Sequence, residues 1–173
     1  MNTQASLLTV TRELVPEDQR MDIVGRLFGM AFPLQLEPVV YGITDRMSGE
    51  YTGGYWHFYT LSNGGFYMAP ATDESFEVSC QNQYRGMLSA DALGITACLY
   101  AYSNLSFSLS DVAREYARHY HLLREYSMVH AEVREILGAT DRGIAGGCYP
   151  RPPPGQAEDF QRDPSRRVGG GGW

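Results

Sequence analysis

The amino-acid sequence predicts an α+β fold, with a small antiparallel sheet of three to four strands built around a central hairpin and packed with about five helices in a single domain. Four observations support this prediction. A length of 173 residues suits one domain, and a hydrophobic content of 43% is normal for a globular core. One stretch rich in aromatic residues has the pattern of a hairpin, and segments on both sides of it show helical periodicity.

Two helices are predicted before the hairpin. Residues 16–28 have a proline at the first helical position, acidic residues in the first turn and a glycine directly after the end. Residues 36–48 are ambiguous, because their apolar residues recur at helical spacing while their β-branched run could also form a strand. We predict a helix there that stops at Gly49.

The hairpin is predicted in GGYWHFYTLSNGGFYMAP, residues 53–70, with strands at about 54–61 and 65–69. Asn63-Gly64 between two apolar runs is a strong hairpin signal, because both central residues of such a turn need φ > 0. Both faces of the first strand are bulky, so we expect one side to be covered and the other partly covered. Alternation assigns Tyr55, His57 and Tyr59 to one face, and Trp56, Phe58 and Thr60 to the other.

Further strands are predicted directly after the hairpin. Residues 76–80 alternate between apolar and polar side chains, which predicts a third antiparallel strand. A turn at 81–83 and a short fourth strand at 84–88 follow. These segments would extend the hairpin into the predicted sheet.

Three helices complete the predicted domain. Ser89 is the expected N-cap of a helix that runs to about Tyr102 and should be the most buried one, because its apolar coverage is wide. Ser108 is the expected N-cap of a long helix whose apolar stripe ends at Tyr126. A last short helix is predicted at about 131–137.

The composition of the chain changes after Gly138. Residues 141–173 are rich in glycine and proline and contain few apolar residues. Such a segment cannot bury enough surface to offset its ordering entropy, so we predict that it is disordered. The predicted α+β domain therefore comprises residues 1–140, and the predicted tail comprises residues 141–173.

Charge and cysteine usage restrict the classes of function. The formal net charge is −6, and residues 1–140 hold 16 acidic residues against 9 arginines, a balance of −7. This acidity argues against stable binding of duplex DNA, and the acids are too scattered for a mimic of duplex DNA. The three cysteines are odd in number and are best explained as reduced thiols. The sequence shows neither a signal peptide nor an apolar run of membrane-spanning length. Together these features predict a cytoplasmic protein without membrane contact.

Catalytic, metal and cofactor motifs give little signal. The chain has no lysine and no phosphate-binding loop, and its histidines lack the spacing of metal ligands, so we predict neither a cofactor nor a metal. Base stacking on the hairpin tyrosines would need a basic groove, and only Arg46 and Arg85 lie near the strands in sequence, so core packing is the preferred interpretation. One alternative remains open, a small hydrolase or nucleotide-binding module that uses His57 with Asp91 or Glu77.

Several strings of this sequence resemble the KlcA/ArdB family of antirestriction proteins. The hairpin string at 53–70 is the most specific, and VPEDQR at 15–20, SADALGI at 89–95 and HLLREY at 121–126 support it by order and spacing. The resemblance implies a compact α+β protein of a mobile element that relieves type I restriction of incoming DNA without being an enzyme and without a cofactor. It implies a direct or indirect partner, either a type I restriction-modification enzyme or an associated host factor.

The resemblance brings no catalytic residues to transfer. If the protein has an interaction surface, we expect it at the hairpin tip and at two charged residues nearby in sequence. Turn chemistry explains the tip residues equally well. The expected surface comprises Ser62, Asn63, Gly64, Gly65, Arg85 and Asp91.

Overall fold

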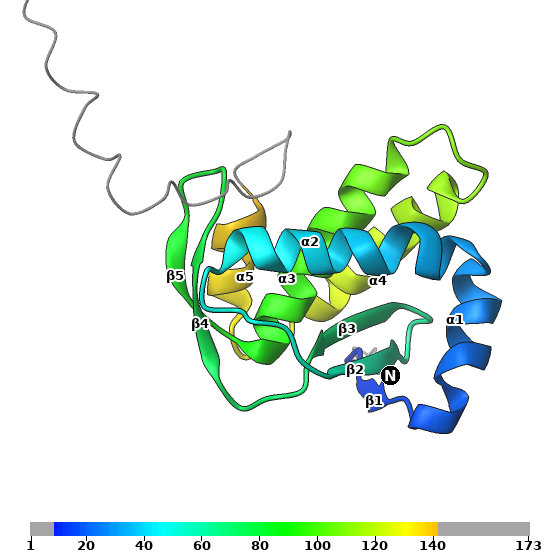
Figure 1. Ribbon diagram of the computed structural model, residues 1–173, viewed down its shortest axis with the longest axis horizontal. Coiled ribbons are helices and arrows are strands. Elements are labelled where there is room, and N and C mark those ends of the chain that lie inside the picture. Colours follow the sequence, from blue (N-terminus) through cyan, green and yellow to red (C-terminus); the bar gives the residue numbers. More distant parts are fainter. Residues whose placement is uncertain (1–8, 142–173) are drawn as a thin grey trace, which may run out of the picture.

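The computed structural model describes residues 9–141, which form five α-helices and five strands (Figure 1). The predicted α+β class is confirmed. The predicted tail, residues 141–173, lies outside this range except for Asp141. The strands are β1 (Arg12–Leu14), β2 (Trp56–Leu61), β3 (Phe66–Pro70), β4 (Ser75–Ser79) and β5 (Arg85–Ser89), and the helices are α1 (Arg20–Phe28), α2 (Glu37–Met47), α3 (Ala90–Ser106), α4 (Ala113–Ser127) and α5 (Val133–Thr140).

The predicted hairpin is the centre of a three-stranded antiparallel sheet of order β1-β2-β3. Tyr59 pairs with Tyr67 across the hairpin, and Leu14 of β1 pairs with Tyr59 on its other side. Trp56 and Phe58 are buried while Tyr55 is half exposed, so the predicted alternation of faces is confirmed. The sequence pattern missed β1, because three residues are too short for alternation to be recognised.

The strands predicted after the hairpin form a separate two-stranded sheet, β4-β5, and do not extend the hairpin sheet. The reason is that α3 covers the free edge of β3. The Met68 N–H donates to Cys98 Sγ at 3.5 Å, and the Tyr102 hydroxyl donates to the Phe66 carbonyl oxygen at 2.9 Å. Burial raises the pKa of the Cys98 thiol to about 12, so the thiol stays protonated and donates back to the Met68 carbonyl oxygen at 3.6 Å. A fourth strand therefore cannot join the sheet beside β3.

Helix α3 is the most buried helix, as predicted, and every residue from Ala92 to Tyr102 is buried. Ser89 is its N-cap, with Oγ accepting the Ala92 N–H at 3.2 Å. Gly94 lies against β3 so closely that a Cβ on it would stand 2.4 Å from the Ala69 Cβ. This close approach lets α3 run directly along the sheet edge.

The helices before the hairpin match the prediction apart from their first turns. A 3₁₀ turn (Glu17–Gln19) precedes α1, and a π-helical turn (Phe32–Leu36) precedes α2. The helix chosen for residues 36–48 is confirmed by α2. Within residues 9–141 no single helix combines the length and apolar character of a membrane span, and one bent pair, Glu17–Phe28 with Phe32–Met47, meets these criteria only across a 90° break.

The predicted N-cap at Ser108 is wrong. Helix α4 begins five residues later, at Ala113, without a side-chain cap. The Ser108 hydroxyl instead pairs with that of Ser110 at 2.8 Å, inside the loop that joins α3 to α4. Local side-chain pairing of this kind competes with capping. The last helix is confirmed, shifted to Val133–Thr140.

Candidate functional site

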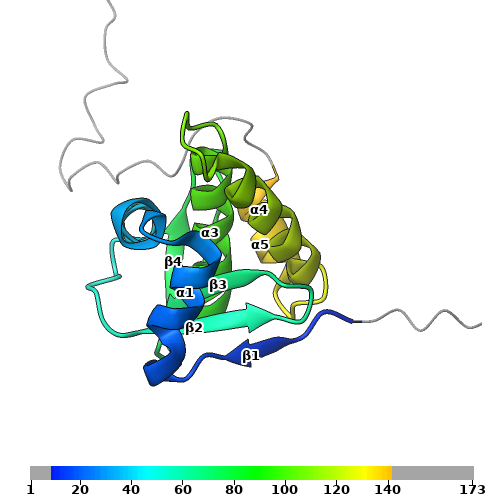
Figure 2. The same cartoon turned by 90° about the vertical axis from the view of Figure 1, so that its right-hand side faces the viewer.

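The hairpin tip packs against α4 (Figure 2). The Asn63 side-chain amide donates to the Leu122 carbonyl oxygen and to Glu125 Oε2, each at 2.9 Å. A Cβ on Gly65 would meet the Leu122 Cβ at 3.0 Å, so the backbone of the tip lies directly on the helix. The tip is therefore an anchor between the sheet and α4.

The expected turn geometry is wrong at one residue. Gly64 has a positive φ of 89°, but Asn63 does not have a positive φ. The Gly64 N–H donates to the Leu61 carbonyl oxygen at 2.8 Å, and the Asn63 side-chain oxygen accepts the Gly65 N–H at 3.0 Å. This is the arrangement of a three-residue hairpin loop, which needs only its last residue in a left-handed conformation.

Of the other expected surface residues, Ser62 lies at the tip, whereas Arg85 and Asp91 do not. Ser62 is exposed and pairs with Thr11, whose N–H donates to Ser62 Oγ at 3.0 Å. Arg85 is exposed on β5, in the second sheet, while Asp91 lies in the first turn of α3. No ion pair joins Arg85 to Asp91 within the described chain. The six residues predicted as one surface are therefore divided among three places.

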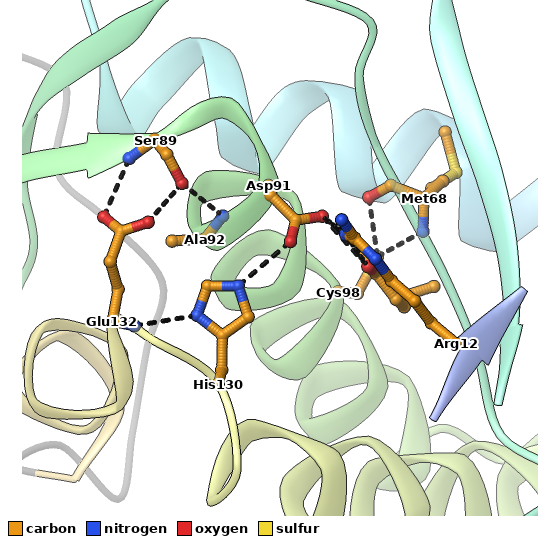
Figure 3. Close-up of polar contacts among 9 residues, drawn as sticks. Arg12, Met68, Ser89, Asp91, Ala92, Cys98, His130 and Glu132 are labelled. Atoms are coloured by element: carbon orange, nitrogen blue, oxygen red, sulfur yellow. Dashed lines mark hydrogen bonds and ion pairs between the residues drawn. The ribbon is translucent and has the colours of Figure 1, made fainter. Parts of the chain in front are cut away.

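Asp91 is the centre of a polar cluster that the sequence did not indicate (Figure 3). Its Oδ1 is ion-paired with Arg12 of β1 and accepts the Tyr67 hydroxyl of β3 at 2.9 Å. Its Oδ2 lies 2.9 Å from His130 Nε2, in the loop between α4 and α5. Arg12 also donates to the Tyr67 hydroxyl at 2.7 Å. Four separate elements thus meet at one carboxylate.

The cluster keeps Asp91 ionised. Burial by itself would raise the pKa of Asp91, but the hydrogen bond from His130 and the charge of Arg12 hold it below the usual range. His130 Nδ1 accepts the Glu132 N–H at 3.0 Å, so the imidazole proton lies on Nε2 and points to Asp91. The Glu132 carboxylate in turn accepts the N–H and the hydroxyl of Ser89, which ties the loop to the start of α3 (Figure 3).

A polar cleft of about 400 Å³ lies beside this cluster. Two rings of the aromatic row predicted for one face of the hairpin strand line this cleft, His57 and Tyr59, with ring centroids 6.2 Å apart. Tyr55 continues the row beyond the cleft lining, 6.0 Å from His57. An arginine guanidinium stands over each end of this row. The Cζ of Arg12 lies 4.6 Å from the Tyr59 centroid, and that of Arg20 lies 4.6 Å from the Tyr55 centroid. The polar lining comprises Arg12, His57, Tyr59, Thr72, Asp73 and Asp91.

This geometry bears on the alternative of a hydrolase or nucleotide-binding module. His57 and Asp91 do share the cleft, but the imidazole that hydrogen-bonds Asp91 is His130. Glu77, the other carboxylate considered, lies on β4 and does not line the cleft. Across residues 9–141 no three histidine, cysteine, aspartate or glutamate side chains are grouped as metal ligands would be.

Sequence reasoning missed Arg12, Tyr67 and His130 as partners of Asp91. Arg12 lies on an unrecognised strand, and Tyr67 was assigned only to the hairpin core. His130 is 39 residues from Asp91 along the chain. A spacing motif could not have found this set, because its members come from four elements with no fixed separation.

Comparisons with known proteins identify the family. A family model described as antirestriction protein matches residues 49–141. The antirestriction protein KlcA of Escherichia coli is 42% identical over 144 residues, which cover 82% of this chain and all of that protein. The uncharacterized protein YafX of E. coli strain K12 is 43% identical over 139 residues, 78% of this chain and 88% of YafX.

A solved structure has the same fold, with a TM-score of 0.71 and 39% identity over 84% of this chain and 100% of that one. It comes from work in which the KlcA and ArdB proteins show a novel fold and antirestriction activity against type I DNA restriction systems in vivo but not in vitro. The fold and the sequence therefore define a small α+β protein of the antirestriction class. The chain belongs to the antirestriction protein family that includes KlcA.

Proposed function

We propose that this protein relieves type I restriction of incoming DNA in the bacterial cytoplasm, as part of a mobile element. The proposal rests on the solved structure that is 39% identical to this chain and is matched over its whole length. In that work the KlcA and ArdB proteins show antirestriction activity against type I systems. The partner would be the restriction-modification enzyme itself or an associated host factor. Activity seen in vivo but not in vitro suits an indirect route or a missing host component.

We propose further that relief of restriction does not depend on DNA mimicry. A mimic needs negative charges at the spacing of duplex DNA, about one per 1.7 Å. Acidic residues of this domain are scattered, and several are held by internal partners, such as Asp91 by Arg12 and Glu132 by Ser89. For the same reason we expect no stable binding of duplex DNA.

Relief of restriction is also proposed to proceed without catalysis. The Asp91–His130 pair has the composition of a catalytic dyad, but both side chains are already held by other hydrogen bonds. Asp91 accepts from Arg12 and Tyr67, and the second nitrogen of His130 accepts a backbone N–H. These contacts support a structural role for the pair, as a clamp between α3, β1 and the loop before α5.

The test is the plating of unmodified phage on cells that carry a type I restriction system. Expression of this protein should raise the plating efficiency toward that of a non-restricting host. Cells with an empty vector and cells expressing the destabilised Trp56→Ala variant serve as controls. Unchanged plating across several type I systems would contradict the proposal.

A further inference from the structure

We propose that the cleft beside His57 binds a cationic side chain, the guanidinium of an arginine, presented by a partner polypeptide. This inference rests on the proposed function, since it names the chemistry of the partner, but binding is measured directly and without a restriction system. The cleft is formed where β1, β2 and the start of α3 meet the segment after β3.

The charge of the cleft favours a cation over an anion. The groups that could bind an anion, Arg12, Tyr67 and His130, already surround the Asp91 carboxylate. Asp73 also lines the cleft, is exposed, and makes no ion pair in the described part of the chain. With one arginine and two aspartates, the lining has a formal charge of −1.

The aromatic row that enters the cleft indicates which kind of cation would suit it. The guanidinium of Arg12 over Tyr59 and that of Arg20 over Tyr55 are each held at 4.6 Å from a ring centroid. His57 lies between these two rings, and no guanidinium of the described chain stands over it. A planar guanidinium laid along His57 would continue the pattern of the row and place its N–H donors toward Asp73.

Stacking of nucleobases fits this row less well. Tyr59 has Arg12 over its ring and Tyr67 stacked against it at 4.9 Å, so little of the ring is free. The row is also not flat, because the His57 ring is turned by 90° from Tyr55 and by 74° from Tyr59. A single-stranded nucleic acid would also bring its negatively charged phosphates close to the two aspartates of the lining. A basic peptide therefore suits the cleft better than a nucleic acid.

The size of the cleft agrees with one long side chain and the peptide groups beside it. Its volume of about 400 Å³ lies at the lower end of ligand pockets, roughly 300–1,000 Å³. His57 Nδ1 is buried and has no hydrogen-bond partner in the part of the chain described, so the imidazole can adopt the tautomer that a ligand requires.

The experiment is a titration of the full-length, isotope-labelled protein, followed by NMR. The probes are a capped Gly-Arg-Gly tripeptide and the same tripeptide with citrulline, which has the shape of arginine without its charge. The arginine peptide should shift the amides of Thr72 and Asp73 and the ring signals of His57, and citrulline should not. Asp73→Asn should weaken arginine binding roughly tenfold, the effect of one charge-assisted hydrogen bond. Asp111→Asn, in the loop at the opposite end of α3, is the matched control and should change nothing.

Three results would overturn the proposal. They are equal shifts with both peptides, no shifts up to about 10 mM peptide, and saturation of the same amides by a thymidine oligonucleotide in preference to the peptide. Circular dichroism of both variants checks that they fold. Phage plating separates this proposal from the proposed function. Protection by a protein that does not bind arginine contradicts the cleft proposal alone, and arginine binding without protection contradicts the function alone.

Discussion

At the scale of the residue, His119 makes the stability of this protein depend on pH. Its side chain is fully buried between Phe28 and Tyr102, with ring centroids at 4.7 Å and 5.7 Å. Its Nε2 lies 3.2 Å from Glu115 Oε1, but neither ring nitrogen has a hydrogen-bond partner in the described structure. Burial lowers the pKa of His119 to about 4, and this effect outweighs the opposite effect of the Glu115 carboxylate.

The sign of the pH dependence follows from this shift. The unfolded chain takes up the proton at a pH near 6.5, before the folded protein does, so stability is full above pH 6.5 and is lost as the pH falls toward 4. We expect a loss of about 3 kcal/mol over this range. His119→Leu should flatten this part of the curve. Urea unfolding between pH 4 and 8 measures both proteins, and equal slopes would contradict the prediction.

Trp56 should matter for stability and not as a contact residue. It is 3% exposed, its Nε1 donates to the Tyr51 hydroxyl at 2.7 Å, and its ring meets Tyr41 edge to face at 5.1 Å. Trp56→Ala should cost about 3–5 kcal/mol, which is a large part of a typical total stability. Thermal unfolding measures the loss. A variant with normal thermal stability and no antirestriction activity would show instead that Trp56 acts at an interface.

At the scale of the element, α3 lies very close to β3 at Gly94. A Cβ on Gly94 would come within 2.5 Å of the Ala69 Cα and of the Met68 carbonyl oxygen, which are backbone atoms that cannot turn away. Gly94→Ala should therefore push α3 from the sheet and cost about 1–3 kcal/mol or more, although alanine favours a helix.

Gly25→Ala in α1 is the matched control for this prediction. A Cβ there meets nothing within 4 Å, so the substitution should stabilise the protein by up to about 1 kcal/mol. Unfolding free energies of the two variants should thus change in opposite directions. A neutral Gly94→Ala variant would mean that the helix can move outward without loss of packing.

At the scale of the whole molecule, α5 and Asp141 are the last part of the chain that the structure describes. Tyr100 donates to the Ala139 carbonyl oxygen at 2.5 Å, and Asn82 donates to the carbonyl oxygens of Gly138 and Ala139. Helix α5 is therefore held in place by residues of the domain that lie before it in the sequence. Asp141 still belongs to this unit, because it pairs with Arg124 at 2.6 Å. The predicted boundary after residue 140 stays a prediction, and a cut after Asp141 would keep this ion pair.

Truncation after Asp141 should leave folding and antirestriction intact. The melting temperature should stay within a few degrees, because the removed segment is rich in glycine and proline and has little apolar surface to bury. The free energy of unfolding should differ by less than about 1 kcal/mol between the proteins truncated after Thr140 and after Asp141, because an exposed ion pair usually contributes no more than this. Calorimetry and phage plating measure both proteins. A drop of tens of degrees would show that the tail is part of the folded structure.

The sequence by itself determined the elements with strong local signals. The apolar spacing of residues 36–48, the cap at Ser89 and the alternation in the hairpin depend on neighbours within a few positions, and all three predictions are confirmed. The family resemblance likewise depends on contiguous strings, above all the one at residues 53–70. Local patterns of this kind act before the chain is folded, and they can therefore be recognised in the sequence.

Only the tertiary structure decided how these elements share edges and charges. The strand β1 exists because β2 offers it a partner, and β4 and β5 form their own sheet because α3 covers the edge of β3. Asp91 was predicted as part of a surface with Arg85, but its neighbours are Arg12, Tyr67 and His130. Such contacts join residues tens of positions apart. Their free energy comes from burial and from paired charges, and neither exists until the chain is packed.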